Sequence, residues 1–529
     1  MTHSNFKKDT AQAVQERDFP RLLKLCRAAQ EADPLFADAW FLESVAAEAG
    51  RDMAAAIKLV SKALELSPGN IEYLVQKARY HSQVSQDEAA KKTADAAIAA
   101  GPRTAQQLDT LGVVLTRLGD YLTAANLLRN AAAAAPKHPQ IRFNLAAAEQ
   151  FLGNDAAAVE NYEAVIRLAP GHARSYWALS ELQKNKSNTQ YETSLRTLAA
   201  NPRLSDRDSL YVAHALARIE ESRGDTNAAI KRLVLAKAHR RKALQYDFTS
   251  DQRMFNALQN KHYAADNSPA KTAGHRQPLF IVGMPRTGTT LLERMLTAHP
   301  LIATLGEQQA LPQAVKHLSG VKGHSVLSEA VVANANIHGQ ELEDRYAALL
   351  KTRTDALPGM PRYVIDKMPL NFLYLGFIFS HMPQARVVVL RRHPMDAGLS
   401  NFRQLFALDY SYYNYSYDLA DTGRYVASFE SLLRHWEQLL GPRLLSVQYE
   451  DLVAGPEPEI RRLLARLELH WDPACLEFHK QGGAVATPSA SQVREPLYST
   501  AVGRWRRYGD ALLPLRKALL DGGIAIPEP

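Results

Sequence analysis

The strongest constraint in the sequence is a proline that recurs every 34 residues in its first third. The five prolines in register are Pro34, Pro68, Pro102, Pro136 and Pro170. A proline ends an α-helix because it lacks the backbone N–H that would continue the hydrogen-bond ladder. A fixed period of this length predicts repeated helical pairs, the second helix of each pair stopping at its proline.

Small residues follow the same period. Five residues before the prolines stand Ala29, Ala63, Ala97, Ala131 and Val165. Gly119 and Gly153 stand 17 residues before the next proline in register, where the turn between two helices is expected. Small side chains let helices approach closely, and glycine permits a left-handed turn. An alanine-rich bundle without a true repeat is the alternative, and the five prolines in register disfavour it.

The 34-residue helix–turn–helix period resembles the tetratricopeptide repeat (TPR). We expect an α-solenoid of about six or seven repeats over residues 1–245, with a slip in register between Trp177 and Ser205. Such superhelices present a concave groove that mostly binds peptides or proteins. The sequence of this half contains no recognisable catalytic constellation.

Composition narrows the class of protein. The 529 residues carry 63 lysines and arginines against 55 acidic residues, a net charge of +8 that suits an anionic ligand or nucleic acid. The two cysteines, Cys26 and Cys475, exclude a disulfide scaffold. Neither a membrane-spanning apolar run nor a signal peptide is recognisable, so we expect a cytoplasmic protein without a membrane span.

The character of the chain changes after a predicted helix and linker at residues 246–276. Leu279–Val282 is an apolar run of strand type, residues 283–290 form a glycine-containing loop, and Leu291–Leu296 has helical spacing. Loop amides and a helix N-terminus that converge on one point favour an anion.

The loop has the G-x-x-x-x-G spacing of a nucleotide P-loop, but Thr289 replaces the lysine that should follow Gly288. A P-loop kinase or NTPase would therefore lack its main phosphate contact. Arg286 supplies a forked cation instead. A structural turn without a ligand is the alternative for this motif taken alone.

A second strand–loop–helix unit follows. Ala385–Leu390 is β-branched, as expected for a buried parallel strand, and is followed by Arg391, Arg392 and a helix that carries Ser400. Basic residues at the end of a parallel strand are usual ligand positions, although such a pair is often only solvated. The predicted fold is an α-solenoid followed by an α/β domain with a central parallel sheet.

Together the two motifs resemble those of sulfotransferases that use 3′-phosphoadenosine 5′-phosphosulfate (PAPS). P-R-T-G-T-T resembles the family's 5′-phosphosulfate loop, and R-H-P-M-D-A-G-L-S resembles its 3′-phosphate motif. The strand ending in Y-E-D-L at residues 449–452 and the segment at residues 491–505 are similar to those of the tyrosylprotein sulfotransferases. The resemblance covers roughly residues 277–515 and implies a sulfotransferase domain over residues 277–529 behind the TPR superhelix.

The resemblance also implies residue roles. The 5′-phosphosulfate would be held by Pro285, Arg286, Thr287, Gly288, Thr289 and Thr290. Arg392 and Ser400 would hold the 3′-phosphate, Tyr449 would lie near the adenine, and Arg504 near the phosphates.

Sulfuryl transfer to a hydroxyl requires removal of the acceptor proton, which a carboxylate can accept. Glu307 stands where the tyrosylprotein enzymes have a glutamate base, although most glutamates are merely on the surface. Lys367 matches the family's D-K-x-P lysine, which neutralises charge on the leaving group, with Ser489 as a candidate helper. We therefore expect catalysis by Glu307, Arg286 and Lys367 without a metal.

The acceptor stays open: a protein tyrosine, a glycan or a small molecule. A tyrosine-rich stretch at residues 410–417 suits either an acceptor-site wall, or a half-buried hairpin or subunit contact. The alternatives to an enzyme that binds PAPS are an inactive TPR scaffold that binds PAP, the donor without its sulfuryl group, and a P-loop kinase. We expect no nucleic acid partner and leave a homodimer open.

Overall fold

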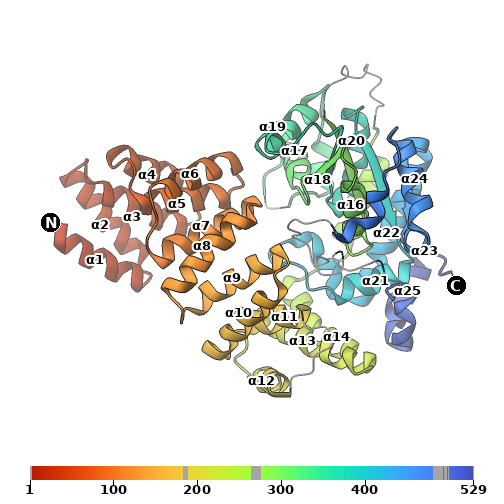
Figure 1. Cartoon of the computed structure of the whole chain (residues 1–529), viewed down its shortest axis with the longest axis horizontal. Coiled ribbons are helices and arrows are strands. Elements are labelled where there is room, and N and C mark those ends of the chain that lie inside the picture. The colour runs from red at the N-terminus through yellow and green to blue at the C-terminus, as the bar shows by residue number, and fades with distance from the viewer. Residues whose placement is uncertain are drawn as a thin grey trace. The chain divides into compact units, whose positions relative to one another are not determined.

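The computed structural model describes residues 3–182, 189–263, 276–323, 325–480, 493, 497 and 500–527. The chain divides into two compact units, Met1–Ser175 and Tyr176–Pro529 (Figure 1). The first unit is helical where it is described, and the second contains a β-sheet.

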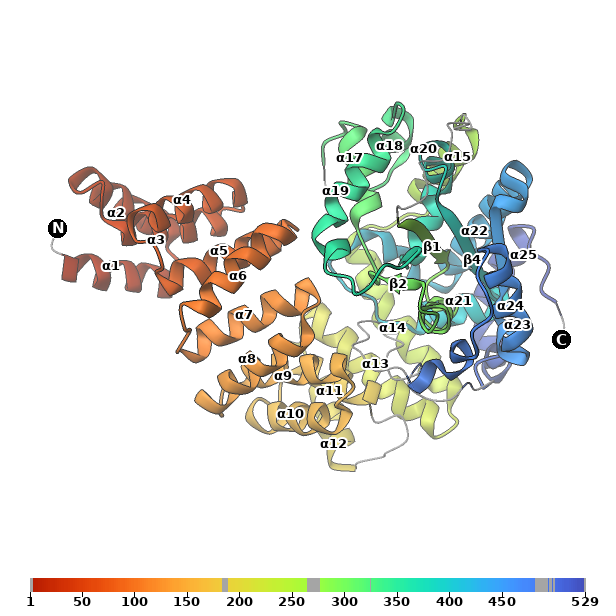
Figure 2. The same cartoon turned by 45° about the horizontal axis from the view of Figure 1, so that its top comes forward.

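Consecutive helices pack in pairs through the first unit (Figure 2). They are α1 (His3–Gln15), α2 (Phe19–Ala32), α3 (Ala37–Ala49), α4 (Met53–Leu66), α5 (Ile71–Gln83), α6 (Asp87–Ala99), α7 (Ala105–Leu118), α8 (Tyr121–Ala134), α9 (Pro139–Leu152) and α10 (Asp155–Leu168). Helix α11 (Ala173–Leu182) begins in this unit and ends in the next.

The periodic prolines and glycines act as the sequence predicts. Helices α2, α4, α8 and α10 each end two residues before their proline. Gly119 and Gly153 both have φ of 85° and cap α7 and α9 in the left-handed conformation. The small residues five positions before the prolines are buried. These observations confirm the repeated helical pair.

A cap with the same period was not predicted. The carboxylates of Asp18, Asp52 and Asp120 accept hydrogen bonds from backbone amides in the first turns of α2, α4 and α8. Such a cap stabilises a helix by about 1 kcal/mol because it satisfies an amide that has no partner within the helix. The cap therefore fixes the start of the second helix as the proline fixes its end.

The second unit opens with helices and then builds a sheet. The opening helices are α12 (Thr189–Ala199), α13 (Asp206–Ser222), α14 (Thr226–Leu244) and α15 (Thr249–Asn260). The strands in the described residues are β1 (Gln277–Gly283), β2 (Ile302–Thr304), β3 (Tyr363–Asp366), β4 (Arg386–Arg391) and β5 (Leu444–Gln448).

Further helices surround the strands. The α-helices are α16 (Thr289–Thr297), α17 (Ala310–Leu318), α18 (Glu329–Asn334), α19 (Glu341–Asp355), α20 (Leu375–His381), α21 (Pro394–Arg403), α22 (Leu419–Leu440), α23 (Tyr449–Ala454), α24 (Pro456–Arg466) and α25 (Leu513–Asp521). The 3₁₀-helices are η1 (Pro369–Tyr374), η2 (Ser411–Tyr417), η3 (Gly441–Arg443), η4 (Pro473–Lys480) and η5 (Arg504–Leu512).

The sheet has the strand order β2-β3-β1-β4-β5, and its paired strands are parallel. Alternate residues of β1 enter two different cores: Phe280 and Val282 pack with residues of α15 and α22, while Leu279 and Ile281 pack with residues of α16 and α24. Both faces of the sheet are therefore buried, as a parallel sheet requires. The predicted central parallel sheet is confirmed.

One local prediction was wrong, and one alternative that the sequence left open is excluded. Tyr449 does not end a strand, because β5 stops at Gln448 and Tyr449 begins helix α23. The tyrosine-rich stretch is not a hairpin, because Ser411–Tyr417 forms the 3₁₀-helix η2. The resemblance implied the strand at Tyr449, and a hairpin was one alternative for the tyrosine-rich stretch. In both places tertiary packing decides the conformation.

The compact units divide after Ser175, whereas the helical pattern continues to Leu244 at the end of α14. Helices α12 to α15 therefore group with the sheet. The predicted limits at residues 245 and 276 remain a prediction, and residues 264–275 of the linker lie outside the described residues.

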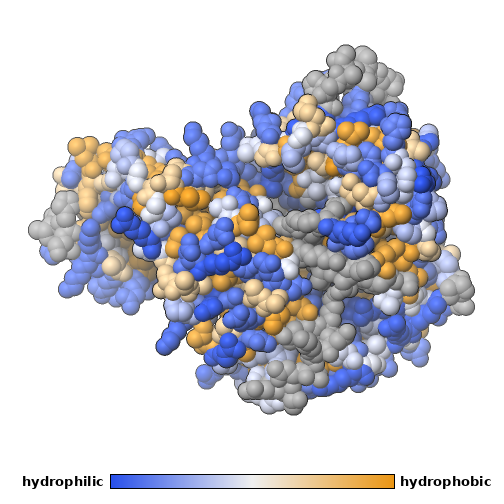
Figure 3. Space-filling model, in the orientation of Figure 1, coloured by the Kyte–Doolittle hydropathy of each residue, from blue (hydrophilic) through white to orange (hydrophobic). Residues whose placement is uncertain are grey.

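In the part of the chain that the structure describes, no helix is long and apolar enough to cross a membrane. On the face in Figure 3, hydrophilic and hydrophobic side chains are intermixed over the helical pairs of the first unit. This pattern is typical of a repeat protein in which each pair buries its apolar side against its neighbours.

Candidate functional site

The loop between β1 and α16 is held in a fixed shape. Gly288 has φ of 105°, and a Cβ at this position would lie 2.6 Å from Cδ2 of Tyr449. The Thr287 hydroxyl donates to the Met284 carbonyl at 2.7 Å. Arg286 has φ of 66°, a conformation that side chains other than glycine rarely adopt. The glycine is needed both for its conformation and for the close approach of the tyrosine ring.

The second predicted motif supports this loop. Nδ2 of Asn401, on α21, donates to the Pro285 carbonyl at 2.7 Å. The guanidinium of Arg392, just after β4, donates to the Arg286 carbonyl at 3.0 Å. The two motifs, separated by about 110 residues in the sequence, thus form one structure at the carboxyl ends of β1 and β4.

A cavity of about 570 Å³ opens beside the loop. Its described lining includes the predicted residues Arg286, Gly288, Thr290, Arg392, Ser400, Tyr449 and Arg504. It also includes three further arginines, Arg218, Arg403 and Arg507, and a single acidic residue, Glu221. Six guanidinium groups against one carboxylate make the cavity strongly positive, so it favours an anionic ligand.

Arg392 is nearly buried in the wall of this cavity. Its guanidinium lies 4.6 Å from the centre of the Tyr449 ring, and its exposed fraction is 8%. Its Nε has no hydrogen-bond partner among the described residues. A buried guanidinium donor without a partner is costly, so this atom indicates a ligand that accepts a hydrogen bond.

The segment that carries Arg504 is fixed by α21. The carboxylate of Asp396 accepts hydrogen bonds from the amides of Gly503 at 2.7 Å and Trp505 at 2.9 Å. Asp396 is buried, so these bonds hold the start of η5 against α21. This contact explains how residues about 110 positions apart reach the same cavity.

Glu307 and Lys367 form a second cluster. The Lys367 ammonium, with a fully buried side chain, lies 2.5 Å from Oε1 of Glu307 and 3.7 Å from Oε2 of Glu293. Burial by itself would lower the pKa of Lys367, but the charges of Glu307 and Glu293 raise it by a larger amount. The pKa of Lys367 is therefore above its ordinary value. The lysine is therefore a cation held between two acids.

Helix α16 connects this cluster with the cavity. Thr290, in the first turn of α16, lines the cavity, and Glu293 lies almost one turn further along the same helix. The Thr304 hydroxyl also donates to Glu293 at 2.6 Å. The acid–lysine pair therefore lies next to the phosphate-type loop, although neither Glu307 nor Lys367 is among the residues lining the cavity.

The remaining predicted residues differ in placement. Pro285 and Thr287 belong to the loop and Thr289 begins α16, and none of the three is among the described residues that line the cavity. Ser489 lies outside the described residues.

Glu293, Asp396, Asn401 and Glu221 were not predicted. The position of Glu293 on the helix after the loop is a signal that sequence could have offered.

The tyrosine-rich helix η2 divides into two parts. Tyr415 is fully buried, and its ring stacks on Tyr425 with centres 3.8 Å apart. Tyr412 is only partly buried, and its hydroxyl accepts a hydrogen bond from Nε2 of Gln309 at 3.4 Å. Gln309 stands two residues after Glu307 in the chain. Tyr415 belongs to the core, whereas Tyr412 borders the loop that carries Glu307.

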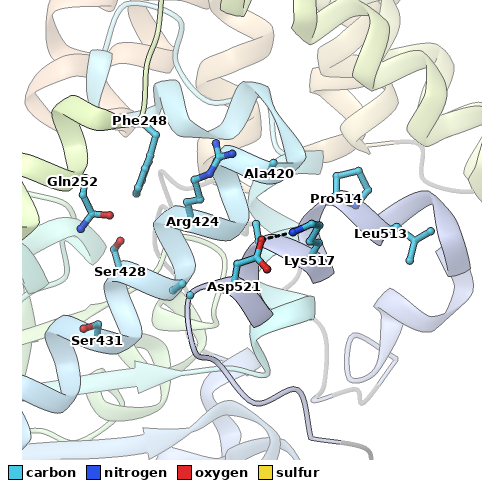
Figure 4. A pocket seen from close by; sticks show the side chains of 13 residues that line it. Phe248, Gln252, Ala420, Arg424, Ser428, Ser431, Leu513, Pro514, Lys517 and Asp521 are labelled. Carbon is cyan, nitrogen blue, oxygen red and sulfur yellow. Dashed lines mark hydrogen bonds and ion pairs between the residues drawn. The ribbon is translucent and has the colours of Figure 1, made fainter.

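A second cavity in the described residues lies elsewhere. It has a volume of about 850 Å³ and lies between α15, α22 and α25 (Figure 4). Phe248, Arg424 and Leu513 are among its lining residues, and the charged Lys517 and Asp521 pair with each other across 2.6 Å. None of the predicted site residues is among the described residues that line it.

Comparison with known proteins assigns the sheet-containing part of the chain. Residues 278–473 match the model of the sulfotransferase family. The second unit contains a sulfotransferase domain. This domain includes the loop, Arg392, Ser400, Glu307, Lys367 and Tyr449. Residues 139–172 match the tetratricopeptide repeat, which agrees with the helical pair α9–α10.

A protein of Aquifex aeolicus is 28% identical over 423 residues, which cover 79% of this chain and 55% of that protein. Protein-tyrosine sulfotransferase 1 of Danio rerio is 24% identical over 246 residues, which cover 43% of this chain and 65% of that protein. The chain thus spans between half and two thirds of these curated relatives.

Among solved structures, the sulfotransferase domain of the Synechococcus PCC 7002 olefin synthase is 21% identical with a TM-score of 0.32, covering 49% of this chain and 100% of that one.

Proposed function

We propose that the protein transfers the sulfuryl group of PAPS to an acceptor hydroxyl. The observation that most supports this proposal is the arginine-lined cavity, which helix α16 connects to the Glu307–Lys367 pair. The match of this region to the sulfotransferase family supports the same reaction class. A nucleotide with several phosphates suits a cavity with six arginines better than a neutral ligand does.

The cavity residues fit such a donor. Arg392 and Ser400 would hold one phosphate, while Arg286 and Thr290 would hold the phosphosulfate at the start of α16. Tyr449 offers an aromatic face beside Arg392 for the adenine end. When bound, PAPS supplies an activated sulfuryl group, and the protein supplies charge and orientation.

Glu307 is proposed as the general base. Its side chain is 37% exposed, so an acceptor can approach it, and the ion pair with Lys367 orients its carboxylate. A carboxylate oxygen of Glu307 takes the proton from the acceptor hydroxyl, which makes the acceptor oxygen nucleophilic. Lys367, kept charged by Glu307 and Glu293, stabilises negative charge on the departing oxygen, an effect of several kcal/mol in order of magnitude.

The acceptor is proposed to be a protein or peptide, and a protein tyrosine is the first candidate because several relatives are protein-tyrosine sulfotransferases. The first unit has a cavity of about 610 Å³ lined by residues of α3, α5 and α7, among them Phe41, Arg79, Asp109 and Arg117. We propose that this groove binds the acceptor protein or a partner, as helical-repeat grooves commonly do.

The test combines binding with chemistry. Purified protein is titrated with PAP by calorimetry, and transfer from labelled PAPS is measured with tyrosine peptides and a lysate of the source organism, with and without EDTA. Glu307→Gln should bind PAP normally and lose transfer by at least about 100-fold, because a positioned general base contributes this much. Glu329→Gln, a change at an exposed glutamate, is the matched control and should transfer at the normal rate.

Each outcome decides between functions. PAP binding without transfer to any acceptor would favour a scaffold that binds nucleotide. ATP binding in preference to PAP would favour a kinase. Equal transfer by Glu307→Gln and the control would remove Glu307 as the base, and loss of activity in EDTA would contradict the expected metal independence.

A further inference from the structure

One wall of the proposed donor cavity comes from a helix that precedes the sulfotransferase domain. Ala217, Arg218 and Glu221, on helix α13, line the cavity together with Arg403 and Arg504. Helix α13 pairs with α14 in the manner of the preceding helical repeats. The helical region and the sulfotransferase domain therefore share a cavity.

Glu221 is the centre of this wall. Both carboxylate oxygens accept hydrogen bonds from the guanidinium of Arg403. Oε1 also accepts from the Tyr508 hydroxyl at 2.8 Å, and Oε2 lies 3.4 Å from the Arg504 guanidinium. The Glu221 side chain is 10% exposed, and that of Arg504 is 38% exposed. Arg403 is thus held tightly, whereas Arg504 is held loosely and faces the cavity.

The charges around Glu221 explain why a carboxylate is needed there. Burial by itself would raise the pKa of Glu221, but Arg403, Arg504 and the Tyr508 hydroxyl lower it by a larger amount. The pKa of Glu221 is therefore below its ordinary value. Burial and the neighbouring charge of Arg403 both lower the pKa of Arg504. Without the carboxylate, two guanidinium groups would repel each other and Arg504 would move away from the cavity.

Helices α13 and α14 are fixed on the sulfotransferase domain by further contacts. The buried Lys237 ammonium, on α14, donates to the carbonyls of Gln404 at 3.2 Å and Ser416 at 3.0 Å. Arg241 pairs with the buried Asp421 at 2.6 Å. The position of Glu221 relative to Arg504 is therefore set by several buried contacts and not by one surface ion pair.

We propose that Glu221 is a positioning residue for the donor site: it holds Arg504 in the orientation that contacts the donor phosphates. The last helical pair, α13–α14, is then a part of the donor site. This inference rests on the proposed function, because it takes PAP-type nucleotides as the ligand of the cavity.

The sign of the effect separates positioning from simple electrostatics. Glu221→Gln makes the cavity more positive, which by itself would tighten the binding of an anion. Loss of the orientation of Arg504 would weaken it. We expect PAP to bind Glu221→Gln about tenfold more weakly than wild type. The control is Glu220→Gln, which removes the neighbouring buried ion pair with Arg232 between α13 and α14 but does not touch the cavity.

A double-mutant cycle with Arg504→Ala tests whether Glu221 acts through Arg504. In the Arg504→Ala background, Glu221→Gln should leave PAP affinity unchanged or slightly raised, because no oriented guanidinium remains to be lost. An equal loss in both backgrounds would show that Glu221 acts only through the fold and would overturn the proposal. Unchanged PAP affinity of Glu221→Gln in the wild-type background would overturn it as well.

If Glu221→Gln does not fold, Glu221→Asp provides the measurement, because it keeps the charge and shortens the reach to Arg504. It should weaken PAP binding while the melting temperature stays close to that of Glu220→Gln, and normal affinity would contradict the proposal. Failure of the wild-type protein itself to bind PAP would contradict the proposed function instead, so the two failures can be told apart.

Discussion

Asp366, at the end of β3, is a buried acid next to the proposed catalytic lysine. It is 1% exposed, and the Tyr346 hydroxyl donates to its Oδ2 at 3.0 Å. Its Oδ1 has no partner among the described residues. Burial raises the pKa of Asp366 from 3.8 to about 8. The carboxyl group is therefore proton-bound in the folded protein at pH values where the unfolded chain has lost the proton.

This difference predicts a pH-dependent effect of Asp366→Asn. Between about pH 4 and pH 8 the folded state binds one more proton than the unfolded state, so the contribution of Asp366 to stability is lost as the pH rises. Asparagine does not titrate. The free energy of unfolding of Asp366→Asn relative to wild type should therefore increase with pH, by up to about 1.4 kcal/mol per pH unit. Urea unfolding at pH 5, 6 and 7 measures it.

Asp355→Asn is the matched control, since Asp355 is exposed and pairs with Lys351 on the surface. Its stability relative to wild type should hardly vary with pH. If the variant at position 366 behaved in the same way, the carboxyl group of Asp366 would be charged in the folded protein.

Residues within short motifs could be predicted from the sequence, and residues that act across the fold could not. Arg286 and Arg392 follow strand-like runs, so their convergence was expected from the rule that parallel strands end at one edge. Glu221 lies on a helix far earlier in the chain, and no local pattern connects it with Arg504. The role of Glu221 depends on how α13 packs against the rest of the second unit, and no short stretch of the sequence indicates that packing.

At the scale of elements, Lys237 joins helix α14 to the end of α21, to Gln404 just after it, and to η2. Its side chain has no exposed surface, and its ammonium donates to the carbonyls of Phe402, Gln404 and Ser416. Three donors of one ammonium group thus satisfy three carbonyls outside any sheet. The lysine therefore supplies hydrogen-bond donors to carbonyls near the ends of two helical elements and in the loop after α21.

Lys237→Met should destabilise the second unit strongly. Methionine keeps the apolar stem but leaves three carbonyls without a donor, each of which costs about 1 kcal/mol or more. We expect a loss of roughly 3 kcal/mol in the free energy of unfolding, measured by urea denaturation. Lys231→Met, at an exposed position on the same helix, should change it by less than about 0.5 kcal/mol. Similar values for the two variants would contradict this role of Lys237.

Regular elements followed their sequence signals closely, and irregular ones did not. The β-branched run became β4, and the helix expected to carry Ser400 is α21. The Y-E-D-L segment and the tyrosine-rich stretch became helical, because contacts such as the Tyr415–Tyr425 stack decide their conformation. Periodicity predicts an element whose burial is regular, but it is uninformative for a segment held by individual contacts.

At the scale of the whole molecule, the helical region contributes to both compact units. The period of 34 residues predicted a helical region over residues 1–245, but it gave no sign that α13 and α14 group with the sheet. Ile230 and Leu233, on α14, belong to the same hydrophobic core as Phe280 and Val387. The apolar surface buried between α14 and the sheet stabilises the second unit by about 25 cal/mol per Å².

The grouping predicts how shortened proteins behave. A fragment of residues 173–529, which begins at helix α11, should fold and bind PAP within about threefold of the full chain. A fragment of residues 246–529 follows the boundary expected from the sequence but lacks α13 and α14. It exposes part of the core, leaves the buried Arg403 without Glu221, and removes Arg241, one of the two arginines that pair with Asp421. Because unpaired buried charges are costly, it should aggregate or melt at a much lower temperature.

Circular dichroism melting and PAP titration of the two fragments, beside the full chain, give the comparison. Normal folding and PAP affinity of the 246–529 fragment would show that the sulfotransferase domain is complete without α13 and α14. Folding with weakened affinity would separate the two contributions of these helices: the packing around Lys237 would be dispensable for the fold, while the Glu221 contact would still be needed for the donor site.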